Sequence, residues 1–291
     1  MSKSSTCGLL GVSRQVYYRS YRSKKEKQDK AEQVIAMVTS IRRDMPRIGF
    51  RKLYYLLNEA LKELNIGRDK LLSILKANHL LIKPRRNYRI TTDSHHRFRK
   101  HKNLIADMPL RYPEQVWVSD ITYIGGRSRN CYLALVTDAY SKKIMGYDVS
   151  NSLATEGFLR ALNMPIKQRK YKNVLIHDSD RGLQYCSNDY QHILNKEQII
   201  PSMTESYDPY ANAIAERVNG ILKQEFLLED YQVDIQTMKL IVKDAVRIYN
   251  TRRPHWSCHM KTPEKMHQQN NLEIKTYKKS ESSKDILATL R

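Results

Sequence analysis

Three carboxylates stand in sequence settings that suit phosphodiester chemistry. Asp120 lies in a strand-like run at 117–123, Asp180 follows a short apolar segment, and Glu216 lies in a stretch with helical spacing. Carboxylate oxygens are the ligands that Mg²⁺ prefers, and two such ions can stabilise both the attacking and the leaving oxygen of a phosphodiester. The three acids therefore predict a divalent-cation site that acts on a nucleic-acid backbone.

A single Asp or Glu is usually a solvated residue, so the argument depends on the combination. Asp120 within an otherwise apolar strand is costly unless it meets a cation. Asn212, Glu216, Asn219 and Lys223 are spaced by four, three and four residues, which places them on one helix face. Glu216 can thus point at the two aspartates while Lys223 holds a phosphate.

The charge of the chain points to a polyanionic partner. The 291 residues carry a formal net charge of +21, and 41% of them are hydrophobic, enough for buried cores. Residues 1–104 hold 25 Lys and Arg against 8 Asp and Glu, which leaves 26 against 22 for residues 105–291. The front third is therefore the main electrostatic footprint. Charge alone also fits a ribosome-associated or membrane-surface protein.

The front third has the periodicity of helices. Apolar residues recur at helical spacing over 31–41 and 50–64, with a break near Pro46. The turn at 65–67 precedes a third predicted helix, Arg68 to Ala77. This is a helix-turn-helix pattern, and we expect DNA contacts from Arg68, Lys70 and Lys76. The first 25 residues are expected to form a short helix with a basic tail.

A basic segment and a change of periodicity follow. Residues 84–107 are rich in Lys and Arg, with aromatic residues interleaved, and we expect Arg85 and Arg86 to follow a phosphate backbone, although a solvated linker would look similar. Beyond them the pattern predicts strands at 116–123, 132–138 and 144–149, a helix at 155–167, a strand at 174–176, a helix at 188–196 and a strand at 199–200. This order describes a mixed sheet with helices packed on it. Asp120 then lies on the first strand and Asp180 just past the fourth, where α/β sheets place ligands.

Other classes of protein are disfavoured. No apolar stretch approaches the roughly twenty residues that span a bilayer, and the start lacks a hydrophobic signal core, so a cytoplasmic protein is expected. The cysteines Cys7, Cys131, Cys186 and Cys258 are scattered, which predicts neither disulfides nor a four-thiolate zinc site. For the cluster His255, Cys258 and His259, a polar loop is favoured over a zinc site because no fourth ligand is evident.

These motifs resemble those of one family over nearly the whole chain. The chain is similar to the integrase-like DDE transposases of bacterial insertion elements, in particular the product of the second reading frame (OrfB) of two-frame elements. The first block is matched by Trp117, Asp120, Thr122 and Tyr123, and the second by Ser179, Asp180, Gly182, Gln184 and Tyr185. The third is matched by Asn212, Ala213, Glu216, Leu222, Lys223 and Glu225. The closing run is matched from Tyr249 through His255, with Thr262 and Pro263 after it.

The resemblance implies a ribonuclease-H-like α/β core in which Asp120, Asp180 and Glu216 bind two Mg²⁺ ions, with Mn²⁺ as a substitute. Metal-activated water would cut one strand at the element end, and the 3′ hydroxyl would attack another phosphodiester without a covalent protein–DNA intermediate. Expected DNA contacts near this site are His177, Arg181, Asn212, Lys223, Arg252 and Arg253. The implied partners are double-stranded DNA at element ends and target, further copies of the chain, and the upstream-frame product as a fusion or a partner, in the bacterial nucleoid.

The expected domains and the open alternatives follow from the same patterns. We expect a basic segment at 1–28, a helix-turn-helix domain at 29–83, a linker at 84–107, the catalytic core at 108–272 and a polar tail at 273–291. Two residues depart from the family pattern: Ala211 replaces an aspartate and Asp178 replaces a second histidine. A weakly active or inactive copy, a non-catalytic DNA-binding regulator and a nuclease that does not join strands are the alternatives.

Overall fold

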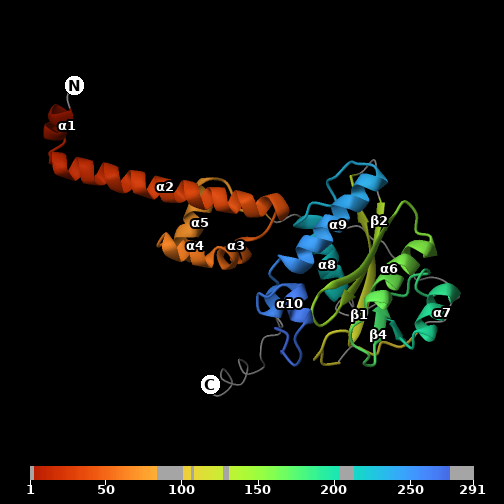
Figure 1. Ribbon diagram of the computed structural model, residues 1–291. Coiled ribbons are helices and arrows are strands. Elements are labelled where there is room, and N and C mark those ends of the chain that lie inside the picture. Colours follow the sequence, from red (N-terminus) through yellow and green to blue (C-terminus); the bar gives the residue numbers. More distant parts are fainter. Residues whose placement is uncertain (1–2, 84–100, 106–107, 127–130, 204–212, 276–291) are drawn as a thin grey trace, which may run out of the picture. The chain divides into compact units, whose positions relative to one another are not determined.

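Two compact units make up the chain, residues 1–84 and residues 85–291. The computed structural model describes residues 3–83, 101–105, 108–126, 131–203 and 213–275 (Figure 1). Arg85, Arg86, Ala211 and Asn212, which the sequence analysis singles out, lie outside these residues. Among the helices in the described ranges, none is long and apolar enough to cross a membrane.

The first unit is helical. Its elements are α1 (Lys3–Leu9), α2 (Arg14–Asp44), α3 (Phe50–Leu56), α4 (Asn58–Glu63) and α5 (Arg68–Ala77). Helix α2 begins after Ser13, whose hydroxyl accepts a hydrogen bond from the Val16 backbone N–H at 3.3 Å. A small core forms where apolar residues of α2 to α5 are fully buried: Val34, Val38, Leu53, Leu61, Leu71 and Leu75. The third predicted helix has the same bounds as α5.

The structure differs from the predicted helices in two places. Helix α2 runs continuously through residues 28 and 29, so the expected end of the basic segment is not marked by a break in the backbone. The basic residues before position 30 are compatible with a helix because Lys and Arg are good helix formers. The predicted helix over 50–64 is divided at Leu57, whose ψ of 4° is not helical.

The second unit is built on a five-stranded mixed sheet. The strands are β1 (Val116–Ile124), β2 (Cys131–Asp138), β3 (Ile144–Ser150), β4 (Ile176–Ser179) and β5 (Ile200–Met203), in the order β3-β2-β1-β4-β5. The pairs β1–β2 and β2–β3 are antiparallel, whereas β1–β4 and β4–β5 are parallel. The predicted order of elements and the mixed sheet are confirmed.

Helices cover both faces of this sheet (Figure 1). They are α6 (Thr155–Gln168), α7 (Asn188–Lys196), α8 (Ala213–Gln224), α9 (Ile235–Thr251) and α10 (Pro263–His267), with a short 3₁₀ turn at Trp256–Cys258. The larger core cluster joins β1 and β2 to α6 and α7, for example through Trp117, Phe158 and Leu194. A smaller cluster on the other side joins Val116 and Val118 to Ala215 of α8.

One strand is displaced from its predicted position. The fourth strand was expected at 174–176, but β4 spans Ile176–Ser179 and Val174 is exposed. The apolar run at 174–176 predicts the wrong bounds for this strand, because the polar residues that follow it, His177, Asp178 and Ser179, are buried inside the sheet. Asp180 therefore follows the last residue of a strand directly.

Gly146 marks the closest approach of β3 and α6 and gives a first prediction. A Cβ atom at this position would lie 2.1 Å from the Ala161 backbone oxygen and 2.5 Å from Pro165 Cδ. Gly146→Ala should therefore lower the free energy of unfolding by roughly 1–3 kcal/mol, measured by chemical denaturation. Gly220→Ala is the control, because a Cβ there meets nothing within 4 Å. An unchanged stability for Gly146→Ala would contradict this packing.

Candidate active site

Strand alternation directs Asp120 toward helix α8. Trp117 and Ile121 belong to the core cluster on the α6 and α7 side, whereas Val116 and Val118 belong to the cluster that contains Ala215 of α8. Successive side chains of a strand point to opposite faces, so Asp120 shares the face of Val116 and Val118. The carboxylate thus lies on the sheet face that α8 covers.

Asn219 of α8 contacts Asp120 directly. Its side-chain Nδ2 donates a hydrogen bond to Asp120 Oδ2 at 2.7 Å, and the residue is 4% exposed. The Oδ1 atom of Asn219 is buried and has no hydrogen-bond partner among the described residues. Because Asn219 follows Glu216 by three residues on the same helix, this bond fixes the turn of α8 that carries Glu216 next to Asp120.

Asp180 reaches the same place from the neighbouring strand. Strands β1 and β4 are parallel, and Ser119 of β1 pairs with Ser179 of β4. Asp120 and Asp180 are the next residues in the sequence, so they follow this pair side by side. The Asp180 Oδ1 atom accepts a hydrogen bond from the Gly182 backbone N–H at 2.9 Å. A Cβ on Gly182 would also lie 2.9 Å from that oxygen, so glycine leaves room for the carboxylate.

The electrostatics of Asp120 show that the acids influence one another. Burial, and after it the negative charge of Asp180, raise the pKa of the Asp120 carboxyl to about 7. Hydrogen bonds from the Ile121 backbone and from Asn219 oppose this rise in the pKa, and Glu216 adds a smaller increase. Like charges held close together in a partly buried site call for a neutralising cation.

Glu216 is less closely associated with this pair than the aspartates are with each other. Its side chain is exposed on α8, and its effect on the Asp120 pKa is the smallest of the causes. In the ranges that the structure describes, no three His, Cys, Asp or Glu side chains are arranged closely enough to hold a metal ion. The structure therefore brings two acids together and places the third on the adjoining helix.

His177 lies behind the aspartates rather than at the surface. Its Nε2 atom is 2.8 Å from Ser119 Oγ and 3.0 Å from Tyr190 Oη, and the residue is 1% exposed. Burial lowers the pKa of His177 to about 4, so the ring is neutral at pH 7. The expected contact with a substrate phosphate is contradicted by this burial. The ring instead connects β4 to Ser119 of β1 and to Tyr190 of α7. The alternation of residues along β4 does not predict these contacts.

Comparison with known proteins identifies the family. Two integrase core domain families match residues 111–209 and 197–263. A 31 kDa protein of insertion element IS600 from Shigella sonnei is 32% identical over 258 residues, which cover 86% of this chain and 92% of that protein. The chain is an insertion-element DDE transposase. The match to the transposase InsF of insertion sequence IS3fB from Escherichia coli is 34% identical and covers 54% of this chain and 55% of that protein.

Solved viral integrases are more distant from the transposase. A simian T-cell lymphotropic virus intasome, determined in complex with a PP2A regulatory subunit, has a TM-score of 0.49 at 19% identity and covers 80% of this chain and 79% of that chain. The HTLV-2 integrase catalytic core, determined with magnesium, has a TM-score of 0.43 at 18% identity and covers 54% of this chain and 97% of that chain. The integrase-core match and the mixed sheet identify the second unit of the transposase as the expected ribonuclease-H-like core.

Several expected cationic contacts of the transposase lie at accessible positions. Arg68, Lys70 and Lys76 are exposed on α5 of the first unit. In the second unit, Arg252 is exposed after α9, while Arg181 and Lys223 are half-buried. Lys223 lies two turns beyond Glu216 on α8, as the helical spacing predicts. Asp178, which stands where the family pattern has a second histidine, is fully buried, and its Oδ1 accepts a hydrogen bond from Ser202 Oγ at 2.6 Å.

Arg253 of the transposase is a correction. It was expected to contact DNA, but its side chain is 1% exposed and forms a two-pronged ion pair with Glu225, with both N–O distances at 2.8 Å. Its guanidinium also lies 5.6 Å from the centre of the Tyr249 ring. The residue therefore joins the end of α8 to the end of α9. The sequence does not indicate that Arg253 is buried, because it is a charged residue next to Arg252, which is exposed.

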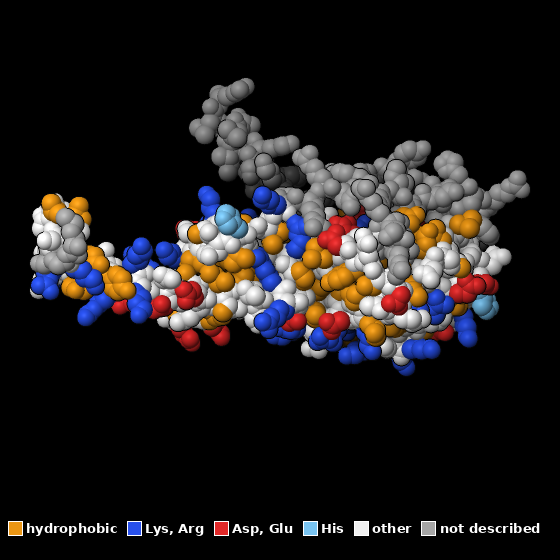
Figure 2. Space-filling view, turned by 90° about the horizontal axis from the view of Figure 1, so that it is seen from above, with side chains coloured by type: hydrophobic (Ala, Val, Ile, Leu, Met, Phe, Trp, Pro, Cys, Tyr) orange, Lys and Arg blue, Asp and Glu red, His pale blue; other side chains and the backbone are white. Residues whose placement is uncertain are grey.

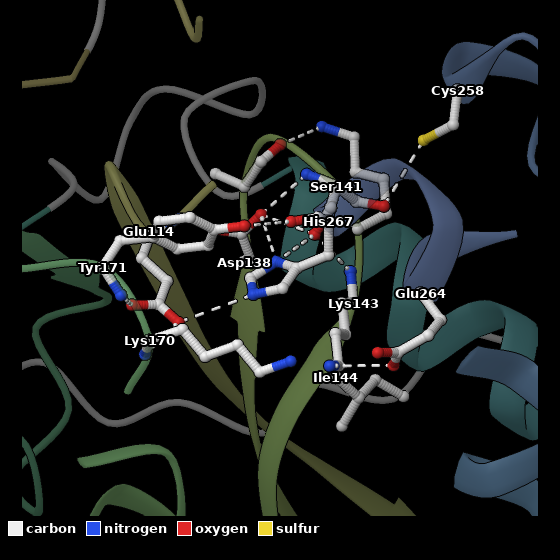
Figure 3. Close-up of polar contacts among 12 residues, drawn as sticks. Glu114, Asp138, Ser141, Lys143, Ile144, Lys170, Tyr171, Cys258, Glu264 and His267 are labelled. Atoms are coloured by element: carbon white, nitrogen blue, oxygen red, sulfur yellow. Dashed lines mark hydrogen bonds and ion pairs between the residues drawn. The ribbon is translucent and has the colours of Figure 1, made fainter. Parts of the chain in front are cut away.

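A second buried polar cluster attaches α10 to the sheet of the transposase (Figure 3). His267 lies 3.5 Å from Glu114 Oε1 and 3.7 Å from Asp138 Oδ1, and its Nδ1 is 3.1 Å from Ser141 Oγ. Burial alone would lower the pKa of His267, but the carboxylates of Asp138 and Glu114 raise it above its usual value. Although serine, histidine and acid meet here, the Ser141 hydroxyl is fully buried and donates to Asp138, so the cluster is structural.

Proposed function

We propose that this transposase cuts one DNA strand at the element end and joins the resulting 3′ hydroxyl to a second phosphodiester, with Asp120, Asp180 and Glu216 as ligands of two Mg²⁺ ions. Mn²⁺ would substitute because it accepts the same oxygen ligands. The observation that carries the proposal is the contact of Asn219 with Asp120, since it holds the Glu216 turn of α8 beside the two coupled aspartates.

The residues present fit such ions. The candidate ligands are oxygen atoms of carboxylates, which suit hard cations and not zinc. The raised pKa of Asp120 reflects burial and negative charge that bound cations would neutralise, and the orphaned Asn219 Oδ1 adds a buried acceptor beside it. When bound, the ions would activate water or the 3′ hydroxyl and stabilise charge on the leaving oxygen.

The protein's own residues contribute position and charge. Asn219 holds Asp120, the Gly182 N–H holds Asp180, and Ser119, His177 and Tyr190 support both strands from behind. Lys223 and Arg181 are proposed to steady phosphates beside the acids. Arg252 in this unit, and Arg68, Lys70 and Lys76 in the first unit, are proposed to bind the DNA backbone. Arg85, Arg86 and Asn212 are proposed contacts as well.

The proposed partners follow from the reaction. Joining element ends to a target needs double-stranded DNA at both, and recombination of two ends favours a multimer of this chain. A product of the upstream frame is proposed to supply end recognition, either as a fusion or as a separate partner. These proposals place the protein on the bacterial nucleoid.

One assay separates this function from its alternatives. Purified protein is incubated with Mg²⁺ and a labelled element-end duplex, alone and with the upstream-frame product. Joined strands support the proposal, nicks alone indicate a nuclease, and a mobility shift without cleavage indicates a regulator. Glu216→Gln should abolish cleavage and joining while the affinity for DNA stays within about twofold. Strand joining by that variant would refute the assigned ligands.

The Asn219 contact gives a further prediction. Asn219→Ala removes the hydrogen bond to Asp120 and should lower the rate of joining about 10- to 100-fold, because residues that orient metal ligands have effects of that size. The Mg²⁺ concentration needed for half-maximal joining should rise in parallel. Asn195→Ala, at an exposed position on α7, serves as the control. Unchanged Mg²⁺ dependence in Asn219→Ala would show that the contact does not position Asp120.

A further inference from the structure

The first third of helix α2 lies outside the core of the described first unit, and its neighbour there is α1, from which Lys3 Nζ lies 5.9 Å from the centre of the Tyr18 ring. All residues from 11 to 22 are exposed, and the buried residues of α2 are Val34 and Val38, both near its C-terminal end. An isolated helix in water gains little from backbone hydrogen bonds alone. An exposed helical segment of this length is therefore suited to a partner.

One face of this segment carries an ordered mixture of cations and aromatic rings. Its members recur at positions i, i+3, i+4, i+7, i+10 and i+11: Arg14, Tyr17, Tyr18, Tyr21, Lys24 and Lys25. We call this set the Arg–Tyr face. The three tyrosines are 38%, 42% and 59% exposed, which is unusual for side chains with so much apolar surface. Figure 2 shows Lys and Arg side chains beside hydrophobic ones along the end of α2 near α1.

We propose that the Arg–Tyr face binds the phosphate backbone of duplex DNA. Residues 14–30 contain seven Lys and Arg against two acidic residues, and no acid lies on the face itself. The segment is about 25 Å long at 1.5 Å per residue, and a major groove about 12 Å wide admits a helix. Tyrosine hydroxyls add neutral donors for phosphate or sugar oxygens.

Charge selects DNA over a second copy of the chain as the occupant. Two Arg–Tyr faces packed together would bring like charges into contact, which opposes association. DNA presents complementary charge along its whole length, and release of its counterions favours binding. This inference rests on the proposed function, and it adds a contact surface outside α5 and the catalytic unit.

The test compares two faces of the same helix. One variant, Arg14→Gln/Lys24→Gln/Lys25→Gln, removes three charges from the Arg–Tyr face. The matched control, Arg19→Gln/Lys27→Gln/Lys30→Gln, removes three charges from the opposite side of the same helix. Glutamine keeps the helix propensity close to that of Lys and Arg, and circular dichroism checks that both variants stay folded.

Binding of the full-length proteins to a labelled random-sequence duplex is followed by fluorescence anisotropy at several NaCl concentrations in EDTA. We expect the Arg–Tyr variant to bind at least about tenfold more weakly, with a slope of log K against log salt that is lower by about 2.7. The control should change the slope by less than about 1. Tyr17→Ser/Tyr21→Ser should weaken binding with an unchanged slope, because neutral contacts release no counterions.

Equal slopes for the two triple variants would overturn the inference and leave the proposed function standing. A change of sedimentation mass in the Arg–Tyr variant, with unchanged DNA affinity, would assign the face to self-association and also overturn it. Failure of the unaltered protein to bind any duplex would contradict the proposed function itself. The absence of Mg²⁺ keeps catalysis out of every comparison.

Discussion

Asp120→Asn is expected to lower strand cleavage and joining by at least about 1,000-fold, because it removes the charge of a proposed metal ligand, and such a charge contributes several kcal/mol to stabilising the transition state. The same variant is more stable toward unfolding at pH 8. Burial and the charge of Asp180 raise the pKa of Asp120 to about 7 in the folded protein, above its value near 4 in the unfolded chain. As the pH rises from the unfolded pKa to the folded pKa, ionisation of Asp120 therefore lowers the free energy of unfolding. The asparagine amide stays neutral, so the variant does not lose this stability.

The measurements are single-turnover product formation on an element-end duplex and urea denaturation without metal. Asp244→Asn is the matched control, since Asp244 is an exposed acid on α9 that pairs with Arg247 on the surface. It should leave activity within about twofold and stability within about 0.5 kcal/mol. An Asp120→Asn variant that is both inactive and less stable would indicate a structural role for the carboxylate.

His267→Ala lowers the free energy of unfolding of the second unit by roughly 1–3 kcal/mol at pH 6, because it removes a cationic partner of buried Glu114 and Asp138 while Arg169, 3.8 Å from Glu114, remains. Loss of α10 from the sheet is the expected consequence. Chemical denaturation measures the effect, and His192→Ala, at an exposed position on α7, is the control. A change below about 1 kcal/mol would show that His267 is neutral in the folded protein.

The pH dependence of this stabilisation has a definite sign. The pKa of His267 is raised in the folded protein by Asp138 and Glu114, so the stabilisation is fully present below the unfolded value of about 6.5. It is lost as pH rises through the folded pKa. The difference in stability between the unaltered protein and His267→Ala should therefore shrink from pH 6 toward alkaline pH. A difference that grows with pH would contradict the ion pairs.

Much of the fold is predictable because its periodicity is regular. The strands at Asp120 and at 132–138, the helix at 188–196 and α5 follow directly from alternating or helical spacing. Strand β4 is predicted poorly because it buries His177 and Asp178 inside the sheet. Sequence patterns register apolar residues, and a buried polar pair with tertiary hydrogen bonds has no such signature.

The site is predictable in part for a similar reason. The spacing of Glu216, Asn219 and Lys223 indicates a shared helix face, and the contact of Asn219 with Asp120 lies on that face. Residue type and position in a motif predict a phosphate contact for His177 and a DNA contact for Arg253, yet both residues are 1% exposed. The partners that bury them, Tyr190 and Glu225, come from other elements of the chain, and no local pattern connects such residues.

The most direct test of the central claim is anomalous scattering from Mn²⁺ in crystals of the protein bound to an element-end duplex. Two ions are expected, with Asp120, Asp180 and Glu216 all contributing oxygen ligands beside the cleaved phosphodiester. Ions bound elsewhere, or a single ion without Glu216 in an active complex, would contradict the claim.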